Sequence, residues 1–160
     1  MKIFISNFKT LIIGSINKDK TPFSSYAPFV YYSNKFYIYI SSIATHTKNI
    51  QRDNNVSLFF IEDESKSTNL FARKRISLQA ESKKIKRDSK RFEELFELYN
   101  EKFDSEMVNM LKNMTDFNLF ELEVKSGEAT FGFGEAYHIG GENMNELVEC
   151  QGSGGHHSKK

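Results

Sequence analysis

Short segments rich in β-branched and aromatic residues follow one another through the first half of the sequence, and polar residues separate them. In 75–81 the alternation is strict, with Ile76, Leu78 and Ala80 on one face. Such alternation is typical of a strand that buries one face. We expect Ser126-Gly127 to turn the chain into its last strand. The pattern predicts seven strands, at 10–16, 23–32, 35–41, 56–62, 75–81, 117–124 and 129–139.

Other segments have helical character. The predicted helices cover 45–52, about 89–100 and about 107–114. The second carries an apolar stripe at positions i, i+3, i+4 and i+7, formed by Phe92, Leu95, Phe96 and Tyr99. The order of elements predicts a mainly β protein with some α structure, an antiparallel barrel of six to seven strands with two to three helices plugging its ends. It lacks the βαβ alternation and the Gly-rich phosphate loop of nucleotide-binding folds.

Composition limits the classes of protein that remain. The 160 residues, 39% of them apolar, suit a single domain over 1–150, followed by a flexible Gly-rich tail over 151–160. A formal net charge of +1 gives no general attraction to nucleic acid. Cys150 is the only cysteine, which excludes an internal disulfide framework. No stretch reaches membrane-spanning length, so we expect a cytoplasmic protein with no membrane partner.

The stretch 129–139 holds two large rings, Phe131 and Phe133, which alternate with Gly132 and Gly134. As a strand it would place both rings on one face and bare backbone on the other. One interpretation is a closing barrel strand whose glycines relieve curvature or allow a bulge. The other interpretation is a bare face against which a flat or bulky ligand could lie.

Charged and nucleophilic residues offer few other candidate sites. Arg73, Lys74 and Arg75 place three cations at the entry to a strand, which is typical either of an anion site or of a charged strand end. The four histidines lack the spacing of a helical zinc motif, and no serine lies in a nucleophile elbow. A structural zinc site and hydrolytic chemistry therefore have no support.

Three stretches together resemble the signature stretches of the HugZ-type haem oxygenases, split-barrel proteins related to pyridoxamine-phosphate oxidase. They are Ala-Thr-His-Thr-Lys-Asn-Ile at 44–50, Ala-Arg-Lys-Arg-Ile-Ser-Leu-Gln-Ala-Glu at 72–81 and Ala-Thr-Phe-Gly-Phe-Gly-Glu-Ala-Tyr at 129–137. Each is weak alone, but their order and intervals match over nearly the whole chain. The resemblance implies a homodimeric split barrel that binds haem near the dimer interface, for iron acquisition. With O2 and an electron donor, it would open the haem to a bilin.

The resemblance also implies roles for particular residues. A histidine of the C-terminal tail would be the axial ligand of the haem iron, which assigns the iron to His157 or His156, with His138 as the competitor. Arg73 and Arg75 would neutralise the haem propionates or hydrogen-bond the bound oxygen. The other residues expected around the haem are His46, Lys48, Lys74, Gly132, Phe133 and Gly134, the glycines leaving room for the ring.

Two alternatives keep the fold and change the function. In the first, Lys48, Arg73 and Arg75 would hold the phosphate of FMN in an oxidoreductase of the pyridoxamine-phosphate-oxidase type. In the second, the protein would carry or sense haem without degrading it.

Overall fold

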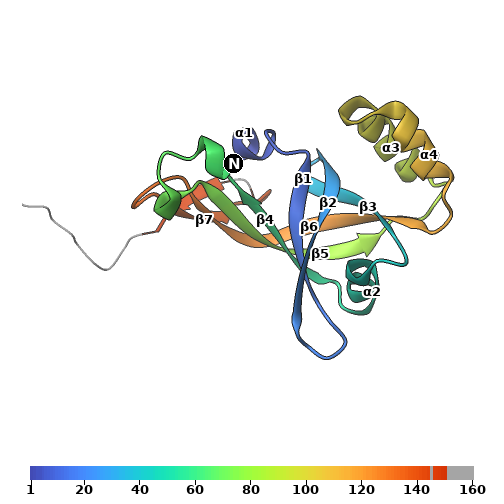
Figure 1. Cartoon of the computed structure of the whole chain (residues 1–160), viewed down its shortest axis with the longest axis horizontal. Helices are drawn as coiled ribbons and strands as arrows, with labels where there is room; N and C mark the ends of the chain where they lie inside the picture. Colours follow the sequence, from blue (N-terminus) through green and yellow to red (C-terminus); the bar gives the residue numbers. More distant parts are fainter. Residues whose placement is uncertain (145, 151–160) are drawn as a thin grey trace, which may run out of the picture.

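The computed structural model describes residues 1–144 and 146–150, which form an eight-stranded antiparallel sheet in the order β3-β2-β1-β4-β5-β6-β7-β8 (Figure 1). A further pairing between β3 and β6 closes the first six strands into a barrel. The strands are β1 (Thr10–Ile16), β2 (Pro22–Tyr32), β3 (Lys35–Ser41), β4 (Asn55–Ile61), β5 (Arg75–Lys84), β6 (Phe117–Thr130), β7 (Ala136–Gly140) and β8 (Glu146–Glu149). The predicted antiparallel split barrel is confirmed, and β8 is an additional strand.

Four helices and two short 3-10 turns complete the fold of the described residues. The helices are α1 (Lys2–Ile5), α2 (Thr45–Arg52), α3 (Lys90–Lys102) and α4 (Ser105–Asn113), and the turns are η1 (Glu64–Lys66) and η2 (Leu70–Ala72). The first helix was not expected from the sequence. No helix in this part of the chain has both the length and the apolar character needed to cross a membrane.

Strand β3 shows how the sequence divides the core in two. Phe36, Ile38 and Ile40 point into the barrel, where they join the main apolar cluster. Tyr37 and Tyr39 point to the outer face and belong to a second cluster. Because successive side chains of a strand point to opposite faces, a strand that is buried on both faces is apolar or aromatic at every position.

Helix α3 covers one part of the outer face of the barrel, over β3 and the adjoining ends of β2 and β6. Its predicted stripe is buried there against β3 and its neighbours, and it consists of Phe92, Leu95, Phe96 and Tyr99. Val108 of α4 belongs to the same outer cluster. The expectation that the helices plug the ends of the barrel is therefore wrong for α3 and α4. Ile5 of α1 and Ile50 of α2 instead contribute to the interior cluster. In Figure 1, α3 and α4 lie together at one side of the sheet.

Strand β6 passes straight through Ser126-Gly127, where the sequence predicted a turn. One β-bulge interrupts its pairing with β5, since Gln79 pairs with Ser126 but Ala80 with Val124. The glycine serves close packing, because a Cβ at Gly127 would lie 2.8 Å from the Ser77 carbonyl oxygen. Beyond the bulge β6 exchanges β3 for β7 as its neighbour, and the sheet leaves the barrel there.

The predicted strand 129–139 is interrupted by a turn over 131–135. The Phe131 N–H donates to the Glu135 carbonyl oxygen at 3.0 Å, and Gly134 has a φ of +74°. A left-handed residue of this kind ends a strand, and glycine adopts it without strain. The two rings consequently do not share a face. Phe131 packs against Phe4, whereas Phe133 is 76% exposed.

Candidate functional site

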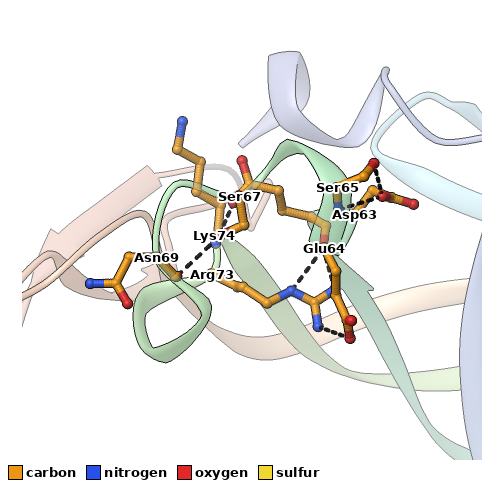
Figure 2. A network of polar contacts seen from close by, with 8 residues as sticks. Asp63, Glu64, Ser65, Ser67, Asn69, Arg73 and Lys74 are labelled. Carbon is orange, nitrogen blue, oxygen red and sulfur yellow. Dashed lines mark hydrogen bonds and ion pairs between the residues drawn. The ribbon is translucent and has the colours of Figure 1, made fainter.

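The loop between β4 and β5 is organised around Arg73, which follows η2 (Figure 2). Its guanidinium donates from Nε to the Glu62 carbonyl oxygen at 3.0 Å, from Nη2 to the same oxygen, and from Nη1 to Glu64 Oε1 at 3.2 Å. Asp63 and Asn69 stabilise the loop further, because the side chain of each accepts a hydrogen bond from the backbone N–H two residues further along the chain. Arg73 is thus committed to its own loop, and a bound anion would have to compete with these partners.

The next two cations have fewer partners. Arg75, the first residue of β5, donates from Nη1 to the Arg73 carbonyl oxygen at 3.2 Å. Lys74 is exposed, and only its backbone groups bond, to Glu62. Lys74 and Arg75 are therefore freer than Arg73 to receive an anion, and an anion site at this cluster stays a prediction.

The Gly-Phe turn over 131–135 lies at the same end of the sheet. Arg75 pairs with Thr130, the last residue of β6, so the turn begins directly beside the basic cluster. Among residues 1–144 and 146–150, leaving out the glycine and its two chain neighbours, no heavy atom lies within 4 Å of a Cβ built on Gly134, whereas one on Gly132 would meet Glu135 Oε2 at 3.2 Å. The backbone at Gly134 is therefore open to approach by a large ligand, and Phe133 projects beside it.

A hollow of about 1100 Å³ opens between α1, the start of β1 and the β4–β5 loop. Its walls combine two rings, Phe4 and Phe8, with four cations and three carboxylates, which are Lys9, Lys66, Arg73, Lys74, Glu62, Asp63 and Glu64. Its volume slightly exceeds the range of about 300–1000 Å³ that is usual for ligand pockets. The sequence reasoning missed Phe4, Phe8 and Lys9, although the i, i+4 spacing of the two rings is a signal for a short helical turn that presents both on one side.

Helix α2 positions His46 and Lys48. The His46 ring is partly buried, and its Nδ1 lies 2.7 Å from Ser25 Oγ. Burial lowers the pKa of His46, because a charged imidazole would lose hydration there. A neutral ring that accepts the Ser25 hydroxyl at Nδ1 carries its proton on Nε2. Lys48 is exposed on the same helix.

These two groups of predicted site residues do not meet within one chain. Asn49 and Arg52 fasten α2 to the end of β1 at Ser15 and Ile16. The basic cluster lies beyond the other end of the barrel, because Arg75 pairs with Ile61 of β4. In Figure 1 the β4–β5 loop and α2 lie on different sides of the sheet.

Of the three histidines predicted as iron ligands, only His138 lies among the described residues. It is exposed on β7, and its Nδ1 is 4.0 Å from Glu128 Oε1 of the neighbouring strand. Within 1–144 and 146–150, no three His, Cys, Asp or Glu side chains are grouped to hold a metal ion. His156 and His157 lie outside the described residues.

Comparison with known proteins places these features in a family. Residues 1–131 match the pyridoxamine 5′-phosphate oxidase family. The chain is also 34% identical over 151 residues to a Vibrio cholerae protein named "Heme oxygenase HutZ", a match that covers 94% of this chain and 85% of that protein.

Solved structures agree with this match. A crystal structure of HutZ from Vibrio cholerae, there called a heme storage protein, has a TM-score of 0.75 at 34% identity over 82% of this chain and 90% of its own. That of ChuZ from Campylobacter jejuni has a TM-score of 0.86 at 31% identity and covers 99% of this chain and 64% of its own. A heme binding protein from Mycobacterium smegmatis, 13% identical with a TM-score of 0.76, shares the fold.

Proposed function

The chain belongs to the HugZ-type branch of the pyridoxamine 5′-phosphate oxidase family, and we propose that it binds haem and opens the porphyrin to a bilin, releasing the iron. The observation that carries the proposal is the 34% identity, over 94% of this chain, to a protein named as a heme oxygenase. Haem, O2 and an electron donor are the proposed reactants, and iron acquisition is the proposed purpose.

The residues around the hollow suit a large ligand that is apolar in the middle and anionic at one edge. Phe4 and Phe8 offer ring surfaces to a macrocycle, and Lys9 and Lys74 offer cations to its propionates. Arg75 is not part of the wall, but it follows Lys74 at the start of β5, and we propose that it adds a third cation. When bound, haem would supply the iron at which oxygen is activated. Arg73 has a different proposed role, since it holds the β4–β5 loop in the shape that presents Lys74 and Arg75.

The Arg75 guanidinium offers the clearest test of ligand binding. We expect Arg75→Ala to weaken haem binding by about ten-fold, the effect of losing one charge-assisted contact of about 1.4 kcal/mol. Lys84→Ala, at the other end of the same strand, is the matched control and should leave the affinity unchanged. Titration of haem into each variant, followed by absorbance, measures both. Equal affinities in the two variants would remove Arg75 from the site.

A homodimer is the proposed assembly, and the uncovered outer face of the barrel supports it. Ile12 pairs with Tyr26 on one side and with Phe59 on the other, so the three side chains form an apolar row across β2, β1 and β4. Ile12 is 41% exposed and Tyr26 67% exposed. Pairing two copies through this face would bury the row, and we propose that it joins α2 of one copy to the basic cluster of the other.

We expect Ile12→Arg to convert the dimer to a monomer, because two arginines would meet near the symmetry axis of a self-complementary interface. Met107→Arg is the control, since Met107 is also half exposed but lies on α4, away from this face. Light scattering at micromolar concentration measures the mass of each. A parent protein that is already monomeric, or an Ile12→Arg protein that stays dimeric, would contradict the proposed interface.

A flavoprotein is the second candidate, because the family model that matches residues 1–131 carries the name of an oxidase. In that case the cations at the start of β5 would bind the phosphate of FMN. Separate titrations with haem and with FMN distinguish the two. In the haem titration we expect a Soret band that saturates when each site holds one haem. In the FMN titration the absorbance should remain that of the free cofactor. Saturable FMN binding without haem binding would replace the proposed function.

A further inference from the structure

Lys102, the last residue of α3, is an amine without an anionic partner. Its Nζ lies 3.7 Å from the centroid of the Phe29 ring and 5.7 Å from that of Phe103. Among residues 1–144 and 146–150, no carboxylate oxygen lies within 4 Å of it. The charged form of Lys102 is thus stabilised by the faces of the two rings and by the C-terminal end of α3, but within these residues by no salt bridge.

This amine lines a cavity of about 470 Å³ between α1, β2 and α3. The apolar part of the wall consists of Ile5, Phe29, Val30, Tyr31 and Leu98. Lys2 and Glu101 are the charged residues that share the wall with Lys102, and Lys9 acts on it from nearby. The wall therefore holds two cations and one carboxylate, and a third cation, Lys9, lies nearby.

Burial, with repulsion from Lys9, lowers the pKa of Lys102 to about 8. At pH 8 about half of these amines would be neutral, against roughly one in 250 for an ordinary lysine. An amine that is desolvated in an apolar pocket beside another cation is the arrangement that makes lysine a nucleophile toward carbonyl groups.

We propose that the Lys102 cavity is a binding site for a small aldehyde that has an apolar body and an anionic group, and that Lys102 forms a Schiff base with it. The Nζ lone pair attacks the carbonyl carbon, and the carbonyl oxygen takes up a proton. The amine then loses its protons as the C=N bond forms and water leaves. Nothing is oxidised or reduced. The apolar wall receives the body of the ligand, and Lys2 attracts its anionic group. The cavity is separate from the hollow proposed for haem, since the two share no lining residue.

The test uses the full chain without haem, so its outcome is independent of haem binding. Para-carboxybenzaldehyde is the probe, borohydride reduction fixes any Schiff base, and mass spectrometry of peptides locates the modified lysines. Lys112 is the matched control, because it too lies half-buried beside an aromatic ring, Phe96, but pairs with Glu93 at 2.5 Å. Lys90, with a 92% exposed side chain, controls for accessibility.

We expect Lys102 to be labelled about ten-fold faster than Lys112 and Lys90 at pH 7. Its rate should level off above pH 8. Leu98→Trp, which fills the cavity, should slow labelling of Lys102 and leave Lys112 unchanged. Benzaldehyde, which lacks the carboxylate, should react more slowly than the probe. Labelling of Lys102 no faster than that of Lys112 or Lys90 would overturn the proposal, and that comparison is made within the parent protein.

Discussion

Removal of residues 152–160 is expected to lower haem turnover by more than ten-fold, because it removes both proposed axial ligands, His156 and His157. The segment contains no apolar residue, so the melting temperature without haem should hardly change. The spectrum of bound haem should shift away from that of an imidazole-ligated iron. Absorbance spectroscopy and thermal unfolding measure the two effects on the same samples.

The competing iron ligand is His138, which is exposed on β7. His138→Ala should retain the parental Soret band, while the double variant His156→Ala/His157→Ala should reproduce the deletion. If the deletion leaves the Soret band unchanged and His138→Ala removes it, the ligand role passes to His138. The tail would then be a linker.

Phe60→Ala is expected to have the largest effect on stability. Phe60 is buried inside the barrel, with ring centroids of Phe8, Phe29 and Phe36 between 5.5 and 5.6 Å away. Truncating a buried ring costs about 3–5 kcal/mol of unfolding free energy, through lost apolar burial and the cavity left behind. The melting temperature should fall by roughly 10 °C for a chain of this size.

The matched control is Phe133→Ala, which removes the same ring from an exposed position. Its unfolding free energy should stay within about 0.5 kcal/mol of the parent. Denaturant unfolding at one fixed protein concentration compares the two variants without interference from assembly. If both variants lost the same small amount of unfolding free energy, the described packing of rings around Phe60 would be contradicted.

The sequence predicted those parts of the fold that depend on local patterns. Alternation located β5, and Ile76, Leu78 and Ala80 are all buried on one face. The spacing of apolar residues located α3, and Ser89 caps it, accepting the Phe92 N–H at 3.2 Å. Such signals survive in a single sequence because each is set by neighbours a few residues away.

Features that depend on distant contacts were not predictable in this way. Gly127 resembles a turn residue, but it is needed because β5 crosses β6 closely there. Gly134 resembles a strand glycine, but its positive φ ends the strand. The partners of Arg73, at Glu62 and Glu64, are nine to eleven residues away across a loop. The sequence therefore identified the basic cluster but not which of its cations are already paired.

The separation of the candidate site into two groups has the same origin. His46 and Arg75 both belong to stretches that resemble the family, yet they lie on opposite sides of one barrel. Linear order does not show which chain of an assembly supplies each group. The closed barrel, with α2 fastened at one end, keeps the two groups apart within one chain, and for this reason we propose that a second copy supplies one of them.

The most direct test of the proposed function is to add ascorbate in air to the haem-loaded protein and to follow absorbance and chelatable iron together. We expect the Soret band to decay, bilin absorbance to rise, and about one iron to be released for each haem lost, with no reaction under nitrogen. Catalase should not prevent the decay, because the reaction takes place in the protein and does not require free peroxide. A Soret band that persists in air, with intact haem recovered at the end, would contradict the proposal and identify a haem carrier instead.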